Sequence, residues 1–278
     1  MAARSVGGLA IREWGDPAQP GLLLWPGLGS TGAYFAGVPE FLPGRLVAVD
    51  PPGFGASPPV DRYRYEQLIE LTCAAVSACG CAAIVGHSLG ADIALGVANQ
   101  PPPGLKAAVL IDGGYLDAPT RAELGIPTRS GRAALLDWLQ ANPLVFADWQ
   151  SAFREIAQLY GGEVTAALEL LVRETFAERD GQVRWRASPE TLADLLLAVG
   201  REDVAPYARG LAVPTLLIAC AQPPEQRRVK EPAWQAFADA SPLVELHVAE
   251  AWGHNPFHQD PQGAARLIAE WLGPRLGG

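Results

Sequence analysis

The sequence predicts an α/β protein in which helices flank one mostly parallel β-sheet. Short apolar runs alternate along the chain with longer segments whose apolar residues recur every three or four positions. Glycines and prolines fall at the ends of these segments rather than in a repetitive tract. The 278 residues, 49% hydrophobic and 18% charged, are enough for one large packed domain with an insertion, and this composition argues against disorder.

The expected strands and helices follow one another in a regular order. Residues 6–15 predict an opening hairpin, and six further apolar runs bring the sheet to eight strands: 22–25, 45–50, 82–86, 107–112, 214–219 and 243–248. Four segments have helical spacing: 65–79, 89–99, 230–240 and 262–272. The run PPPG at 101–104 ends the helix that begins at residue 89.

The alternation of strands and helices stops after the sixth strand. Between Asp112 and Val213 the sequence predicts consecutive amphipathic helices with no strand between them, at 130–141, 145–160, 163–180 and 188–200. We interpret this block as a helical cap over one edge of the sheet, with residues 116–206 forming the cap and residues 1–115 and 207–278 the core. The cap is rich in aromatic residues, of which we expect about a third to face a cavity.

Charge and composition exclude several classes of partner. The net charge of −9 and the isoelectric point near 5.0 disfavour nucleic acid and anionic membranes, which would repel the chain. We expect a cytoplasmic protein because no segment resembles a signal peptide or a membrane span. The four cysteines are too few and too irregularly spaced for a disulfide framework or a zinc site, and no phosphate-binding glycine motif occurs. The expected partner is a small-molecule substrate, with no cofactor and no metal.

The segment GHSLG at 86–90 places one serine between two glycines. A strand is expected before it and a helix after it, so the pattern G-x-S-x-G predicts a sharp turn that exposes the Ser88 hydroxyl. Glycines are needed at such a turn because the neighbouring backbone comes too close for a Cβ. The alternative is that Ser88 only caps the helix. We interpret Ser88 as a nucleophile.

With these motifs the chain resembles the α/β-hydrolase superfamily over most of its length outside residues 116–206. The segment LLLWPGLGS resembles the oxyanion segment of that family, with Pro26 in place of the usual histidine. The resemblance implies that the backbone N–H groups of Leu28 and Leu89 form the oxyanion hole. It also implies a structural role for Asp50, which begins the loop DPPGFGAS.

The resemblance also implies which histidine acts as the base. The chain has four histidines, and the segment EAWGHNPFHQDP resembles the final Gly-His loop of the family, so His254 is the expected base. His87 lies inside the serine turn and is expected to pack, while His247 falls in a strand. His258 follows His254 by four residues, but no further ligand completes a metal site.

The carboxylate is missing from its usual place. The family carries it after the strand that corresponds to 214–219, where this chain has Cys220 and Pro223 instead of glycine and aspartate. Asp112 ends the strand beside that of the serine, and adjacent strands lie ~4.8 Å apart, so its carboxylate can reach His254. Glu225, two residues beyond the usual position, is the alternative acid, and a site without a functional acid is the third possibility. We predict Asp112.

A serine, a histidine and an oxyanion hole imply acyl transfer to water through an acyl-enzyme. The predicted reaction is hydrolysis of carboxylic esters of small to medium hydrophobic substrates, with Trp25, Tyr34 and Phe35 lining the pocket. The alternatives within this fold are a carbon–carbon bond hydrolase, a lactonase and a cofactor-free haloperoxidase. The altered acid loop also leaves open a non-catalytic binding protein.

Overall fold

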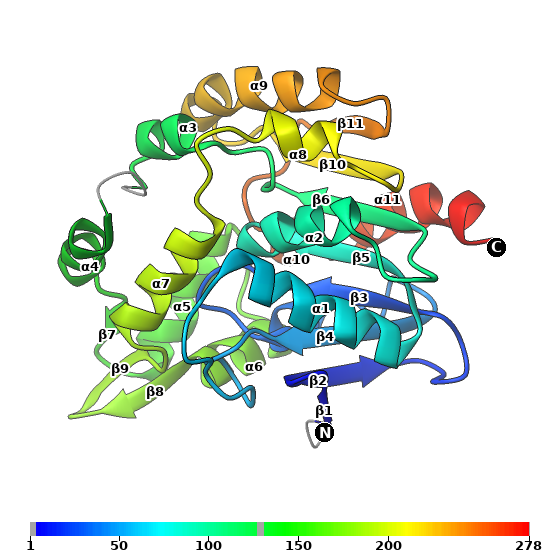
Figure 1. The fold of residues 1–278 in the computed structure, drawn as a ribbon. Helices are drawn as coiled ribbons and strands as arrows, with labels where there is room; N and C mark the ends of the chain where they lie inside the picture. The colour runs from blue at the N-terminus through cyan, green and yellow to red at the C-terminus, as the bar shows by residue number, and fades with distance from the viewer. Residues whose placement is uncertain (1–3, 127–130, 278) are drawn as a thin grey trace.

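The computed structural model describes residues 4–126 and 131–277, and an eight-stranded sheet runs through its centre (Figure 1). The strand order is β1-β2-β4-β3-β5-β6-β10-β11. Strands β1 (Arg4–Val6) and β2 (Leu9–Trp14) form the expected hairpin, and β2 pairs antiparallel with β4 (Arg45–Asp50). All other neighbours are parallel: β3 (Gly21–Trp25), β5 (Cys81–His87), β6 (Ala107–Ile111), β10 (Thr215–Cys220) and β11 (Val244–Ala249).

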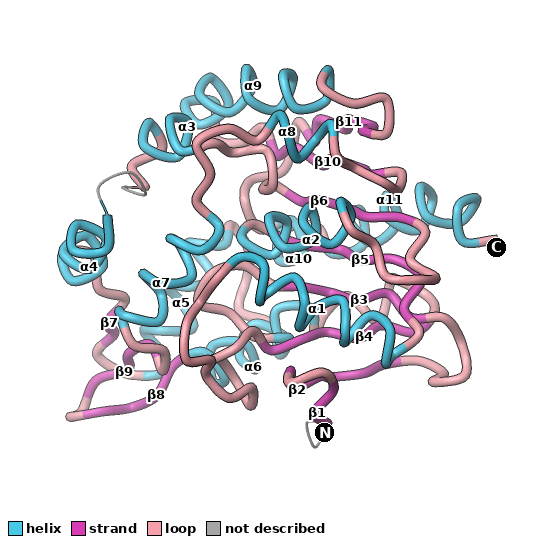
Figure 2. The backbone as a smooth tube through the Cα atoms, viewed as in Figure 1, coloured by secondary structure: helices cyan, strands magenta, loops and turns pink. Residues whose placement is uncertain are grey.

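Helices cover both faces of the sheet, as the colouring by secondary structure shows (Figure 2). One face packs against α1 (Tyr65–Cys79), α2 (Leu89–Asn99), α8 (Ala205–Arg209) and α9 (Pro224–Asp239). The other face packs against η1 (Gly32–Phe35), α10 (Pro256–Gln259) and α11 (Pro261–Leu276). Because successive residues of a strand point to opposite faces, Leu23 and Trp25 join the first layer, and Leu22 and Leu24 the second.

The predicted fold class and mostly parallel eight-stranded sheet are confirmed, and the predicted helix at 65–79 coincides with α1. Helix α9 is longer than expected and begins at Pro224 instead of residue 230. Proline fits the first helical position, where no intrahelical partner exists for a backbone N–H, so the prolines at this end of α9 do not prevent a helix.

The segment between β6 and β10 contains the helices α3 (Ala118–Glu123), α4 (Gly131–Ala141), α5 (Trp149–Tyr160), α6 (Ala166–Thr175) and α7 (Pro189–Val199). Helices α4, α5 and α7 lie at the left of the molecule in Figure 1, α3 lies nearer to α9, and α6 lies below the main sheet near the centre of the view. The expectation that no strand interrupts them is wrong. A three-stranded antiparallel sheet of order β7-β9-β8 is built from β7 (Val145–Phe146), β8 (Phe176–Arg179) and β9 (Gln182–Trp185).

The turn between β8 and β9 explains this error. Asp180 and Gly181 both have a positive φ, of 53° and 72°, which is the geometry of the two-residue turn that joins antiparallel strands. An Asp-Gly pair between alternating residues is a hairpin signal, so residues 176–179 form a strand and the helix that was expected to continue to residue 180 ends at Thr175.

The carboxyl ends of β5, β6, β10 and β11 meet at one edge of the sheet. Asp50, at the same end of β4, accepts hydrogen bonds from the backbone N–H groups of Gly32 and Ala56, both at 2.9 Å, and so joins two loops. In the part of the chain that the structure describes, none of the helices combines the length and the apolar character needed to span a bilayer.

Candidate active site

Ser88 lies in the sharp turn between β5 and α2. Its backbone has φ 55° and ψ −121°, outside the usual regions for a residue with a side chain, and its hydroxyl makes no capping bond to α2. A Cβ on Gly86 would lie 2.1 Å from the Gly90 carbonyl oxygen, and one on Gly90 would lie 2.2 Å from that of Trp25. The two glycines therefore permit the turn, which directs the Ser88 hydroxyl away from the helix.

His254 connects Ser88 to Asp112. Its Nε2 lies 3.0 Å from the Ser88 Oγ, and its Nδ1 lies 2.7 Å from the Asp112 Oδ2. Since a carboxylate only accepts, Nδ1–H donates to Asp112, and the tautomer with its proton on Nδ1 keeps the Nε2 lone pair free to accept the Ser88 hydroxyl proton. The His254 side chain is 46% exposed and that of Asp112 is 1% exposed, so the chain of hydrogen bonds runs from the cavity into the protein.

Asp112 follows β6 and is held by several donors. The Tyr115 hydroxyl donates to its Oδ1 at 3.0 Å, the backbone N–H of Cys220 donates to Oδ1 at 3.3 Å, and the Lys230 ammonium lies 3.0 Å from both oxygens. Burial alone would raise the pKa of this carboxyl. The hydrogen bond from His254 and the charge of Lys230 outweigh burial and hold the pKa of Asp112 well below its usual range.

Glu225, the alternative acid, lies in the first turn of α9 and is exposed. There it is near the positive end of the helix dipole, which accounts for an acidic residue at this place. Of the two candidate carboxylates, the one that His254 contacts is therefore Asp112.

Leu28 and Leu89 line the same cavity as Ser88, and their backbone N–H groups find no acceptor among the residues that the structure describes. Leu89 opens α2, whose first N–H groups have no partner within the helix. A Cβ on Gly27 would lie 3.1 Å from the Ser88 Cβ, so the absence of a side chain there lets the two loops approach. Two free donors beside a hydroxyl can stabilise an oxyanion.

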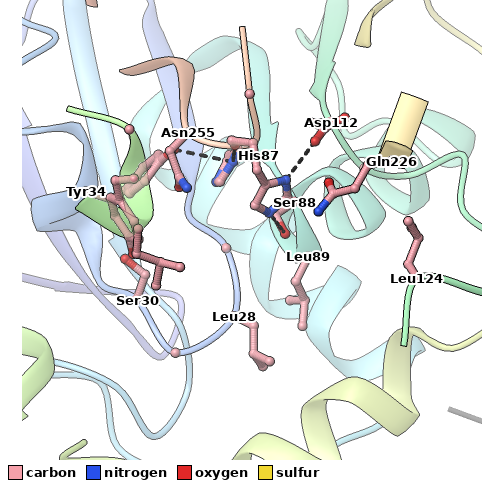
Figure 3. A pocket seen from close by; sticks show the side chains of 18 of the residues that line it. Leu28, Ser30, Tyr34, His87, Ser88, Leu89, Asp112, Leu124, Gln226 and Asn255 are labelled. Carbon is pink, nitrogen blue, oxygen red and sulfur yellow. Dashed lines mark hydrogen bonds and ion pairs between the residues drawn. The ribbon is translucent and has the colours of Figure 1, made fainter. Parts of the chain in front are cut away.

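A cavity of about 930 Å³ lies above Ser88. Ser88 and Asp112 lie on one side of the view in Figure 3, and Ser30, Tyr34 and Asn255 on the other. Much of the lining is apolar, and this apolar wall consists of Leu124, Ile126, Leu144, Ile156, Phe176, Trp185 and Leu196. Of the aromatic residues within 116–206, Tyr160, Phe176 and Trp185 line the cavity.

Of the three predicted pocket residues, Tyr34 lines the cavity, but Trp25 and Phe35 lie in the core. The Trp25 side chain follows the strand alternation toward α1, where its Nε1–H donates to the Thr72 Oγ1 at 3.0 Å. Phe35 packs edge-on against Phe257, with ring centroids 5.3 Å apart. Both side chains are fully buried. Their proximity in sequence to the oxyanion segment therefore did not indicate which way these two side chains point.

His87 contacts the backbone of His254, and this contact was not predicted from the sequence. Its Nε2 lies 2.5 Å from the backbone carbonyl oxygen of His254, and its ring stacks on that of Tyr34 with centroids 4.7 Å apart. Since a carbonyl only accepts, Nε2–H is the donor. Burial, together with the neighbouring His254 ring, lowers the pKa of His87 to about 3 and keeps the ring neutral.

We expect His87 to make the protein less stable as the pH falls from about 6.5 toward 3. Across that range the unfolded chain binds a proton at this histidine and the folded chain does not, so stability decreases by up to about 1.4 kcal/mol per pH unit. From about pH 7.5 to pH 5 this site alone accounts for a loss of about 2 kcal/mol. Denaturant unfolding of wild type and His87→Gln at both pH values measures this loss of free energy of unfolding. If the two proteins lose the same amount, His87 is not the residue responsible.

The contact between Lys230 and Asp112 was also not predicted from the sequence, although the spacing of Lys230 from the apolar residues of its helix indicated a buried position. Lys230, Trp234 and Phe237 are the buried residues of α9, at the spacing of four and three that marks one helix face. A lysine on the apolar face of a helix needs a buried partner, and Asp112 is that partner. As for metals, the described residues contain no group of three or more His, Cys, Asp or Glu side chains placed to hold an ion.

The comparison with known protein families fits this geometry. Residues 22–267 match the model of the alpha/beta hydrolase family. The chain belongs to the alpha/beta hydrolase family. The match spans the Ser88 turn, the Asp112 strand end and the His254 loop, so membership in this family supports a hydrolase.

Two curated relatives and one solved structure illustrate the range of the family. A Klebsiella pneumoniae (strain 342) protein, whose name describes it as a carbamate hydrolase, RutD, is 28% identical over 223 residues, 77% of this chain and 76% of that protein. A 2-succinyl-6-hydroxy-2,4-cyclohexadiene-1-carboxylate synthase of the same strain is 26% identical over 194 residues, 68% and 67% of the two chains. The crystal structure of an E-2-(acetamidomethylene)succinate hydrolase shares the fold, with a TM-score of 0.77, 21% identity and 98% of each chain covered.

Proposed function

We propose that this alpha/beta hydrolase is a serine hydrolase that cleaves carboxylic esters through an acyl-enzyme. The observation that carries the proposal is the position of His254, within hydrogen-bond distance of both the Ser88 Oγ and the Asp112 Oδ2. A hydroxyl with a base at 3.0 Å, itself oriented by a buried carboxylate, is the arrangement that activates a serine.

In the first half of this reaction, the Ser88 Oγ attacks the ester carbonyl while its proton passes to the His254 Nε2. Asp112 stabilises the resulting imidazolium through the Nδ1–H bond and stays ionised, in keeping with its lowered pKa. The tetrahedral oxyanion binds the N–H groups of Leu28 and Leu89. His254 then protonates the alcohol that leaves, and an acyl group remains on Ser88.

In the second half, a water molecule takes the place of the alcohol. His254 accepts a proton from this water as its oxygen attacks the acyl carbon, and a second tetrahedral intermediate collapses to release the acid and restore the Ser88 hydroxyl. The exposure of His254 to the cavity supports this step, because water can reach Nε2 without displacing a buried group.

The substrates that fit best are small to medium and hydrophobic. The cavity volume of about 930 Å³ and its apolar wall support this choice. We further propose that residues 116–206 act as a cap that selects the substrate, since Phe176, Trp185 and Leu196 of that segment line the cavity.

A panel of chromogenic p-nitrophenyl esters tests the substrate class. We expect neutral acyl chains of two to eight carbons to be turned over faster than acyl groups that end in a carboxylate. When a neutral chain contacts the apolar wall, both surfaces are removed from water, and this burial is favourable. A preference for the charged acyl groups would contradict the proposal. A p-nitrophenyl carbamate and a vinylogous 1,5-diketone in the same panel separate carbamate and carbon–carbon bond hydrolysis, the activities suggested by the relatives and by the fold.

A further inference from the structure

A buried lysine lies behind the candidate active site. The Lys230 side chain is 3% exposed, and its Nζ contacts both oxygens of Asp112 at 3.0 Å. The neighbouring cations of α9 are different: Arg227 pairs with Glu231 and Glu250 at the surface. Transferring an ammonium group from water into the protein interior costs free energy. A lysine buried at this position is therefore expected to have a structural or functional role.

The proposed reaction does not use this lysine directly. Protons pass between Ser88, His254 and the substrate, while Lys230 contacts only Asp112 of the three proposed catalytic residues. Asp112 Oδ2 receives His254 and Lys230, and Oδ1 receives Lys230, Tyr115 and the Cys220 N–H. By bridging both oxygens, Lys230 prevents rotation of the carboxylate and keeps Oδ2 directed at the His254 Nδ1.

The lysine also changes the charge that His254 meets. A carboxylate and an ammonium in contact sum to zero, so the imidazolium formed during the reaction lies beside a neutral pair instead of a lone anion. Burial lowers the pKa of His87 to about 3 and raises those of Tyr115 and Cys220 well above their usual values. The carboxylate of Asp92, which also lines the cavity, is paired with Arg121 and Arg201. Beyond His87, burial likewise raises the pKa of Tyr34 and lowers that of His258 to about 4.

We propose that Lys230 is a positioning residue that orients the Asp112 carboxylate and, by cancelling its charge, sets the pH below which His254 no longer accepts the Ser88 proton. The inference rests on the proposed serine mechanism. It also accounts for the place of the acid, Asp112, which follows β6 although the family's usual carboxylate follows β10. Helix α9, which follows β10, supplies the Lys230 cation to the acid of the neighbouring strand.

The test compares Lys230→Met with Arg228→Met, which removes a charge from an exposed position of the same helix. Removing the ammonium leaves Asp112 as a lone anion, which favours the protonated imidazole. We expect the acidic limb of the pH profile, for fluorophosphonate labelling of Ser88 and for kcat/KM, to move up by about one pH unit in Lys230→Met. In Arg228→Met the profile stays unchanged, and Lys230→Arg restores the wild-type limb because the cation is kept.

Two further measurements keep the inference testable. If Lys230→Met does not fold, Lys230→Gln removes the charge while keeping a hydrogen-bond donor, and the same shift is expected. An NMR titration of the His254 imidazole in each variant reads the protonation without any turnover, so it separates a failure of the serine mechanism from a failure of this inference. A uniform loss of activity, with the same acidic limb and the same titration as wild type, would show that Lys230 is only structural.

Discussion

Alanine in place of Ser88 will abolish covalent labelling by a fluorophosphonate and lower ester turnover by about 10⁴-fold or more. The reason is geometric: no other hydroxyl within the described part of the chain lies at hydrogen-bond distance from the His254 Nε2. Without the nucleophile, the cavity can still bind an ester, and the free N–H groups of Leu28 and Leu89 can still polarise it. Some residual hydrolysis by water is therefore expected.

Ser77→Ala is the matched control for this variant. Ser77 is an exposed residue of α1 and its hydroxyl contacts nothing in the site, so this variant will label and turn over substrate as wild type does. Intact-mass spectrometry after labelling gives one adduct for wild type and Ser77→Ala and none for Ser88→Ala. An adduct on Ser88→Ala, or full ester turnover by it, would overturn the assignment of the nucleophile.

A local pattern was enough to predict the Ser88 turn, and the resemblance of one loop to the α/β-hydrolase superfamily indicated His254. The serine turn is defined by five consecutive residues: a Cβ on Gly86 would lie 2.1 Å from the Gly90 carbonyl oxygen within the turn, and one on Gly90 would lie 2.2 Å from the Trp25 carbonyl oxygen of β3. Asp112 needed one step more, an argument from neighbouring strands, and the structure brings all three residues together. Proximity of this kind can be predicted because the fold turns positions in sequence into positions along one sheet edge.

Side-chain direction could not be predicted in the same way. Trp25 and Phe35 flank the oxyanion segment in sequence, but each points into a core layer, and Tyr34 between them faces the cavity. The difference depends on packing against α1 and α10, far along the chain. Lys230 and His87 were missed for the same reason, since their partners Asp112 and His254 are 118 and 167 residues away.

Asparagine in place of Asp112 will lower kcat by about 10⁴-fold, whereas Glu225→Gln will leave it almost unchanged. An amide can present its NH₂ group to the His254 Nδ1, which favours the tautomer with the proton on Nε2. That ring can no longer accept the Ser88 proton, and no buried anion stabilises an imidazolium. Glu225 is exposed at the start of α9, so its loss removes only a surface charge.

Stability separates this catalytic effect from damage to the fold. Asp112→Asn leaves the Lys230 ammonium buried without its counter-charge, and breaking a buried pair in this way costs about 3–5 kcal/mol. The double variant Asp112→Asn/Lys230→Met removes both charges and is expected to regain much of that free energy of unfolding while staying inactive. Denaturant unfolding and ester kinetics on wild type, Asp112→Asn and the double variant distinguish the loss of catalysis from the loss of stability. A loss of kcat below about tenfold in folded Asp112→Asn would mean that His254 works without this carboxylate, and the acid would have to be sought elsewhere.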